Sequence, residues 1–138
     1  IAADEMQSDS VRLSKRNENL KKSPNVNFRE LNSLALGRLD EAEFDLVWVD
    51  GDHTFPIVAC DIANAVRLHK PNGTLVCDDV YLADGGMNGG WGSQETHRAL
   101  QAFTEAKIIS TQYVLKSVLP NKNFNSKVQK HLAVCKLL

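Results

Sequence analysis

Two short apolar runs, separated by a segment of helix length, constrain the fold of this chain more than any other sequence feature. Residues 44–49 and 74–77 are nearly all apolar and rich in β-prone side chains, which is typical of strands covered on both faces of a parallel sheet. Between them, apolar positions at helical spacing predict a helix over residues 56–69, which the turn-forming residues 71–73 should end. Strand, helix and strand in this order predict a right-handed βαβ unit with two parallel strands.

The patterns on either side of this unit predict two more helices and three more strands. Residues 4–22 and 94–106 carry apolar side chains at helical spacing, and each is expected to form a helix. Residues 26–31 alternate apolar and polar, as a half-buried strand does, whereas residues 108–118 and 130–137 are β-rich runs separated by turn-forming residues. The last two runs predict an antiparallel hairpin beside a mostly parallel sheet, so the expected fold class is α/β.

The size and charge of the chain narrow the classes of function it can serve. With 138 residues, 43% of them hydrophobic, the chain has room for one domain, expected over residues 1–138. A net charge of −1 argues against nucleic-acid binding, and the six lysines of residues 106–138 are interpreted as solvated strand faces. The sequence has no apolar run long enough to span a membrane, and three scattered cysteines predict buried free thiols in the reducing cytoplasm.

Acidic side chains follow both central strands, at the sheet edge where open α/β folds bind their ligands. Asp50 comes directly after the first strand, and Asp78 with Asp79 comes directly after the second. Residues 39–66 hold seven acids and no lysine or arginine, so the converging carboxylates need positive charge from elsewhere. A divalent cation with oxygen ligands, Mg²⁺ or Ca²⁺, is the expected compensation.

Each side chain near these strand ends also has an interpretation without a ligand. A single aspartate after a strand is typical of a helix cap or a turn, and Asp52 is a candidate cap for the helix that follows. Asp61 is expected on the solvated face of that helix. His53 can serve as a base, a ligand or a bystander. Trp91, in the glycine-rich residues 83–93, either faces a substrate or packs down without a function.

Two segments together resemble the later motifs of class I S-adenosylmethionine-dependent methyltransferases. Residues 44–53, FDLVWVDGDH, and residues 71–79, PNGTLVCDD, are similar to a variety of this family with the pattern IDGDHxY, a helix, a PGG turn and a strand ending in DD. Phe55 stands in place of the usual tyrosine, and Asn72 stands in place of the first glycine of the turn. The resemblance covers residues 25–105.

This resemblance implies a Rossmann-like methyltransferase fold, whose sheet has the strand order 3-2-1-4-5-7-6. The chain would supply the C-terminal part of that fold, with the first strand missing and an antiparallel hairpin at its end. The sequence has no GxGxxG turn between a strand and a helix, where the family holds its cofactor. A missing first strand would expose the edge of residues 44–49, and we expect a homodimer that completes the sheet.

The resemblance also implies methyl transfer to a hydroxyl group of a small molecule, assisted by a metal ion. Asp50, Asp78 and Asp79 match the metal ligands of similar O-methyltransferases, and His53 is a candidate catalytic base. The cation would bind the substrate hydroxyl, lower its pKa and orient the alkoxide toward the methyl group of the cofactor.

For the cofactor, S-adenosyl-L-methionine, the resemblance points to the N-terminal part of the chain. The first residues would end the second strand of the family fold, with Asp4 or Glu5 binding the ribose. Asn32 or Ser33 would lie near the adenine, and Asp50 is also a candidate cofactor contact.

Two other functions fit parts of the sequence. Asp50 and Asp52 form a DxD pair, with which nucleotide-sugar glycosyltransferases clamp manganese against a diphosphate, but this interpretation leaves Asp78 and Asp79 unexplained. A methyltransferase-like domain that binds a partner without catalysis is the second alternative, and the missing glycine-rich turn favours it.

Overall fold

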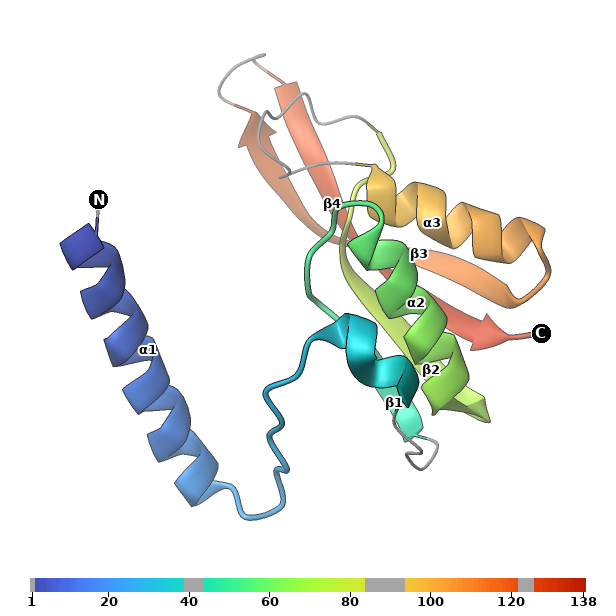
Figure 1. The fold of residues 1–138 in the computed structure, drawn as a ribbon. Helices are drawn as coiled ribbons and strands as arrows, with labels where there is room; N and C mark the ends of the chain where they lie inside the picture. Colours follow the sequence, from blue (N-terminus) through green and yellow to red (C-terminus); the bar gives the residue numbers. More distant parts are fainter. Residues whose placement is uncertain (1, 39–43, 84–93, 122–125) are drawn as a thin grey trace. The chain divides into compact units, whose positions relative to one another are not determined.

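The structure, a computed structural model, describes residues 2–38, 44–83, 94–121 and 126–138 (Figure 1). The chain divides into two compact units, the first ending at Leu31 and the second beginning at Asn32. Trp91 and the glycines around it lie outside the described residues. Within the described ranges, no helix is long and apolar enough to cross a membrane. The single domain expected over the whole chain stays a prediction.

The first unit consists of helix α1, Ala2–Lys22, and the segment that follows it. This helix confirms the expectation for residues 4–22, and it ends on two lysines whose charge is favourable beside the last helical carbonyls. Arg16 pairs with Glu30 at 3.6 Å, and its guanidinium carbon lies 4.4 Å from the centre of the Phe28 ring. These two contacts fold the segment back along the helix.

Two expectations for strands in the first unit are wrong. Residues 26–31 form no strand, although they alternate apolar and polar side chains. The alternation describes side chains that would suit a sheet, but a strand also needs a neighbour to pair its backbone groups. The segment expected to end a strand is instead helical at Ala2–Asp4, so Asp4 lies in the first turn of α1.

The second unit is built on a four-stranded sheet with the order β1-β2-β4-β3. Its strands are β1, Phe44–Val49; β2, His69–Val80; β3, Ile109–Asn121; and β4, Ser126–Leu137. Strands β1 and β2 are parallel, whereas β4 runs antiparallel to both β2 and β3 (Figure 1). The predicted parallel pair and C-terminal hairpin are confirmed, and the order matches strands 4-5-7-6 of the implied methyltransferase fold.

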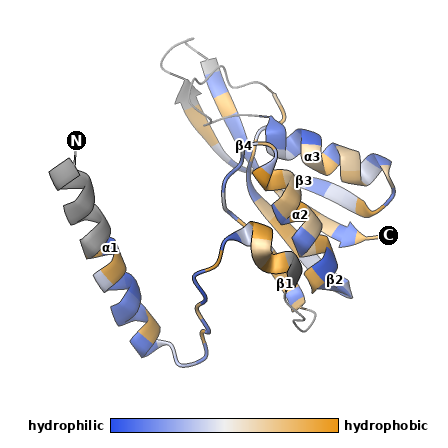
Figure 2. Ribbon diagram, in the orientation of Figure 1, coloured by the Kyte–Doolittle hydropathy of each residue, from blue (hydrophilic) through white to orange (hydrophobic). Residues whose placement is uncertain are grey.

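Helices α2, Ile57–Leu68, and α3, Glu95–Glu105, pack against each other and against one face of the sheet (Figure 1). Both match the predicted helices to within one residue at each end. The 3-10 helix η1, Ser33–Arg38, lies against α2. In Figure 2, hydrophobic residues are prominent on η1 and α2, while α3 mixes hydrophobic and hydrophilic residues. The most buried side chains of this layer are Val58, Ile62, Leu75, Cys77, Val80, Leu100, Ile109, Ala133 and Cys135.

Burial of these side chains holds β1 and β2 in place, and the acids lie at the ends of these two strands. Each fully buried aliphatic side chain contributes about 1.5–3 kcal/mol of transfer free energy. Cys77 and Cys135 are buried free thiols, as predicted, and Cys60 is partly buried. Burial raises the pKa of the Cys77 thiol well above its ordinary value, which keeps that sulfur protonated.

One face of β1 is left uncovered by the other described elements of the second unit. Leu46 and Trp48 expose 57% and 50% of their surface, while Val47 and Val49 belong to the packed face beneath α2. Side chains alternate between the two faces of a strand, so α2 shields only every second residue of β1. The prediction that β1 is covered on both faces is therefore wrong for this part of the chain.

The turn predicted at residues 71–73 falls within the bounds of β2, where the pairing with β1 is irregular. Gly73 is tightly enclosed there, because a Cβ atom would lie 3.0 Å from the carbonyl oxygens of Phe44 and Lys70. Only glycine fits this position without movement of the backbone. The turn is accommodated as an irregularity in the pairing of β1 with β2, so β2 begins before it, at His69.

Asp78 and Asp79 lie inside β2, which runs three residues beyond its predicted end. The strand bulges at this point: β2 has one more residue than β4 between Cys77 and Val80, and Asp79 adopts a positive φ of 54°. Strand β3 bulges at Lys116, against the same stretch of β4. Because a bulge redirects side chains and increases local twist, the two bulges set the directions of both acids and of Lys116.

Candidate functional site

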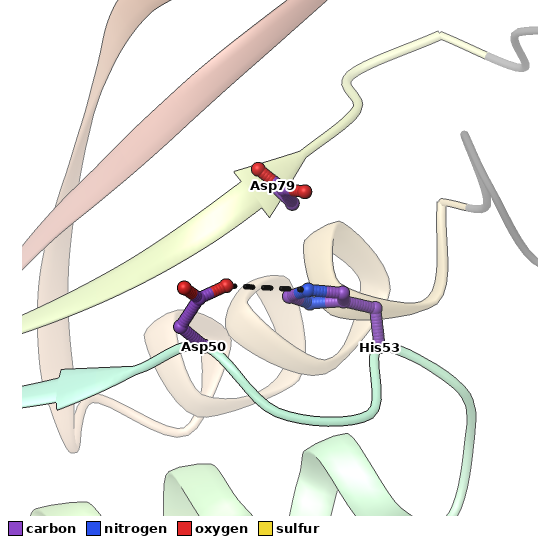
Figure 3. A group of neighbouring side chains, drawn as sticks. All are labelled: Asp50, His53 and Asp79. Carbon is purple, nitrogen blue, oxygen red and sulfur yellow. Dashed lines mark ion pairs between the residues drawn. The ribbon is translucent and has the colours of Figure 1, made fainter. Parts of the chain in front are cut away.

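Three side chains converge at the carboxyl ends of the parallel strands. Asp50 follows β1, His53 lies in the turn after it, and Asp79 comes from the last residues of β2 (Figure 3). One ligand atom from each lies within 4.8 Å of the other two. His53 Nε2 is 3.8 Å from Asp50 Oδ1, and Figure 3 shows these two side chains pointing toward each other with Asp79 beside them. We refer to Asp50, His53 and Asp79 as the acid–histidine group.

The turn that carries His53 is held by hydrogen bonds on both sides of it. Asp52 Oδ1 accepts from the backbone amide of Thr54 at 2.8 Å and from its hydroxyl at 2.6 Å. These two bonds hold the pKa of the Asp52 carboxyl below its ordinary value. The amide of Phe55 donates to Glu95 Oε2 at 2.9 Å, which ties the turn to the start of α3. Asp52 therefore shapes this turn, and α2 itself has no side-chain cap.

Gly51 brings the backbone of the turn close to α2. A Cβ atom at this position would lie 3.2 Å from Asp61 Oδ2, so a larger residue would push the turn away. Asp61 is only partly exposed, and its Oδ1 is buried without a hydrogen-bond partner among the described residues. The expectation that Asp61 lies on a solvated face is therefore wrong, because the turn after β1 covers it.

Asp78 lies next to Asp79 in the sequence but forms an ion pair of its own. Its side chain is 8% exposed, and Lys116 Nζ lies 2.5 Å from Oδ1 and 2.6 Å from Oδ2. The amide of Asp79 donates to Oδ1 as well, at 2.6 Å. Burial acts to raise the pKa of Asp78, but the hydrogen bonds from Lys116 and the Asp79 amide outweigh it and leave the pKa below its ordinary value. The same pair raises the pKa of Lys116.

A second lysine neutralises Asp79. Lys130 Nζ, from β4, lies 2.6 Å from Asp79 Oδ1, and Lys116 Nζ lies 3.4 Å from the same oxygen. The interpretation of residues 106–138 as solvated strand faces is therefore wrong for Lys130, whose side chain is 15% exposed, whereas Lys116 is both ion-paired and 38% exposed. The positive charge that the acids require comes from β3 and β4, and no spacing within the sequence connects these residues to Asp78 or Asp79.

The candidate cofactor contacts lie in other elements. Asn32 Oδ1 accepts from the backbone amide of Leu34 at 2.9 Å, at the start of η1. The carbonyl oxygen of Ser33 accepts from Asn64 Nδ2 at 3.0 Å, which connects η1 to α2. Asp4 belongs to the first unit, in α1. The roles of Asp4, Asn32, Ser33 and Asp50 toward a cofactor stay predictions.

An open hollow of about 250 Å³ lies between α3 and β3. His97 Nδ1 and the Tyr113 hydroxyl share a hydrogen bond of 3.0 Å there. Burial lowers the pKa of His97 and raises the pKa of Tyr113 to about 12, so both side chains are neutral near pH 7. The hollow shares no residue with the acid–histidine group.

The sequence matches a known protein family over residues that include the two parallel strands. A family model described as a methyltransferase domain matches residues 3–80, a span that includes β1, α2 and β2. No curated protein matches the sequence. The matched span carries Asp50, His53, Asp78 and Asp79, but it stops before both lysines.

Several solved structures have the same fold at low sequence identity. A Klebsiella pneumoniae protein assigned as an O-methyltransferase has a TM-score of 0.58 and 20% identity, over 88% of this chain and 55% of its own. The methyltransferase homolog protein of Pyrococcus horikoshii has a TM-score of 0.58 and 16% identity, over 94% and 51%. The O-methyltransferase TomG of Streptomyces achromogenes, solved with S-adenosylmethionine, has a TM-score of 0.53 and 19% identity, over 75% and 45%. This chain therefore spans about half the length of the solved structures it matches.

Proposed function

This chain belongs to the methyltransferase domain family, and we propose that it is part of an S-adenosylmethionine-dependent methyltransferase acting on a hydroxyl group of a small molecule. Two of the structures with the same fold are described as O-methyltransferases, and TomG was solved with the methyl donor. The glycosyltransferase alternative accounts only for Asp50 and Asp52. The β1-β2-β4-β3 sheet favours the methyltransferase.

The pair formed by His53 and Asp50 is the observation that carries this proposal. His53 Nε2 lies 3.8 Å from Asp50 Oδ1 at the sheet edge where open α/β folds bind ligands. We assign His53 the role of a base that takes the proton from the substrate hydroxyl at Nδ1, because the other ring nitrogen, Nε2, faces Asp50. Asp50 orients the ring and stabilises the imidazolium that forms. The methyl donor, when bound, would supply the methyl group: an O–C bond would form, the S–C bond would break, and S-adenosylhomocysteine would leave.

The acid–histidine group also fits a divalent cation. Its three ligand atoms lie within 4.8 Å of one another, and carboxylate oxygens are the ligands preferred by Mg²⁺ and Ca²⁺. We propose Asp50 and Asp79 as the protein ligands: the ion pairs of Asp79 with Lys116 and Lys130 are made through Oδ1, whereas Lys116 holds both oxygens of Asp78. A bound cation would supply a Lewis acid that lowers the pKa of the substrate hydroxyl.

The methyl donor in this proposal is S-adenosyl-L-methionine, with Asp4, Asn32, Ser33 and Asp50 as candidate contacts. Asn32 Oδ1 and the Ser33 carbonyl are engaged within the second unit, so contacts to adenine would use other polar atoms of these two residues. Asp50 is more than half exposed and can contact a ligand directly. A ribose contact by Asp4 would involve the first turn of α1 rather than a strand end.

We further propose that the chain acts in the cytoplasm as a homodimer. Within the described residues, β1 pairs only with β2, so its second edge presents unpaired amide and carbonyl groups. Pairing with a second copy would satisfy them. Light scattering coupled to size exclusion measures this directly: a species of dimer mass is expected, and monomer mass at high micromolar concentration would contradict it.

A methyl-transfer assay tests the function. The polypeptide encoded by the complete gene is incubated with isotope-labelled S-adenosylmethionine and a panel of hydroxylated small molecules. The substitution His53→Gln is expected to lower the turnover number by about 10²–10⁴-fold, the usual contribution of a general base. Lys127→Ala, at an exposed position on β4, serves as the matched control and should leave the rate unchanged. An active enzyme whose rate is unaffected by His53→Gln would overturn the base assignment.

A further inference from the structure

Four charged side chains form a compact cluster beside the acid–histidine group. Lys116 contacts both carboxylate oxygens of Asp78 and reaches Asp79, while Lys130 contacts Asp79 from the other strand. Asp78, Asp79 and Lys130 are each at most 15% exposed in their side chains. The cluster therefore pairs two acids with two lysines, and of the four only Lys116, at 38% side-chain exposure, is open to solvent.

The contact between Lys116 and Asp78 crosses a whole strand. Neighbouring strands lie about 4.8 Å apart, so the backbones of β2 and β3 are about 10 Å apart with β4 between them. A side chain as long as lysine is needed to bridge that gap. Each of the two residues sits at a bulge, and both bulges face the same stretch of β4 around His131. The contact thus depends on two local irregularities at the same level of the sheet.

From this geometry we propose that Lys116 is a positioning residue that occupies both oxygens of Asp78 and thereby weakens binding of a divalent cation at the acid–histidine group. This inference rests on the cation site of the proposed function. With Lys116 in place, both oxygens of Asp78 are occupied and positive charge lies 3.4 Å from Asp79. Lys116 therefore repels a cation that approaches Asp50 and Asp79, and Asp78 has no oxygen free to bind that cation.

Removing Lys116 should strengthen cation binding in two ways. Asp78 loses its partner and becomes available as a further carboxylate ligand next to Asp79. The electrostatic repulsion between the Lys116 ammonium group and the incoming cation disappears as well, while Lys130 stays beside Asp79 in the wild type and the variant. A buried carboxylate without a partner is costly, so a cation that pairs with it gains additional affinity.

Isothermal titration of the folded 138-residue chain with MgCl₂ and CaCl₂ tests the inference. The variant Lys116→Met is expected to bind the cation at least tenfold more tightly than the wild type. Lys127→Met removes one lysine from the same hairpin at an exposed position and should leave the affinity unchanged. In the double variant Lys116→Met/Asp78→Asn, the gain should be largely lost, because Asp78 is the ligand that the single variant releases.

The outcomes separate this inference from the proposed function, because cation binding is read without methyl transfer. Unchanged or weaker binding by Lys116→Met overturns the inference, and so does tight binding that persists in the double variant. If only Lys116→Met binds a cation, the inference stands and the wild type works without a metal. If Lys116→Met does not fold, Lys116→Gln carries the same comparison, since it removes the charge, is too short to hold Asp78 and keeps a polar group at this partly exposed position.

Discussion

Asp50 and Asp78 look alike in the sequence and differ in the folded chain. Each comes directly after an apolar run of β-prone residues. In the structure, the Asp50 side chain is 56% exposed and faces His53, three residues away. Asp78 is buried inside β2 and bound by Lys116, thirty-eight residues away. The difference shows that the position of an acid after a strand does not establish its role, because its partners decide whether it is available to a ligand.

The largest expected effect is on stability. The substitution Asp78→Ala should lower the free energy of unfolding by about 2–3 kcal/mol, since it leaves Lys116 without its carboxylate and the Asp79 amide without its acceptor. Asp50→Ala, the matched control at the exposed acid, should change it by less than about 0.5 kcal/mol. Urea unfolding followed by circular dichroism measures both values. Equal losses of unfolding free energy in the two variants would contradict the prediction, because the two aspartates would then contribute alike to stability.

Acid unfolding should sharpen the same comparison. Because the pKa of folded Asp78 lies below its ordinary value of 3.8, the unfolded chain takes up the proton first as the pH falls. The stabilisation from ionised Asp78 is therefore fully present above pH 3.8 and is lost as the pH falls through the lower folded-state pKa. The difference in the free energy of unfolding between wild type and Asp78→Asn should therefore decrease as the pH falls below 3.8. A difference between wild type and Asp78→Asn that stays constant down to pH 2 would contradict the prediction.

The smallest expected effect concerns added cation. Magnesium or calcium at about ten times its dissociation constant should stabilise the wild type by about 1.4 kcal/mol, equivalent to a rise of several degrees in the melting temperature. Asp50→Asn should abolish this rise, whereas Asp78→Asn should retain some of it, because Asp78 is occupied by Lys116. Thermal unfolding with and without millimolar MgCl₂ gives the answer. A rise lost only in Asp78→Asn would reverse the assignment of the ligands.

Local patterns predicted most of the second unit. Helices α2 and α3, the parallel pair β1 and β2, and the C-terminal hairpin all arise from side-chain periodicity, which acts over one or two turns or a few strand residues. The same reasoning failed at residues 26–31 and at the outer face of β1. In both places the pattern describes side chains suited to a sheet or a core, and the outcome depends on whether a distant segment supplies the partner.

The sequence by itself determined the pair formed by Asp50 and His53, because two residues so close in a turn after a strand are held together by local hydrogen bonds. Only the tertiary structure decided the state of Asp78. Its partner Lys116 lies on a strand that is not adjacent in the sheet, and the contact requires bulges in both β2 and β3 at the same level of β4. A bulge of one residue changes the hydrophobic periodicity of a strand very little, so the sequence does not reveal it. The bulge nevertheless redirects the side chains on which the charge balance of this site depends.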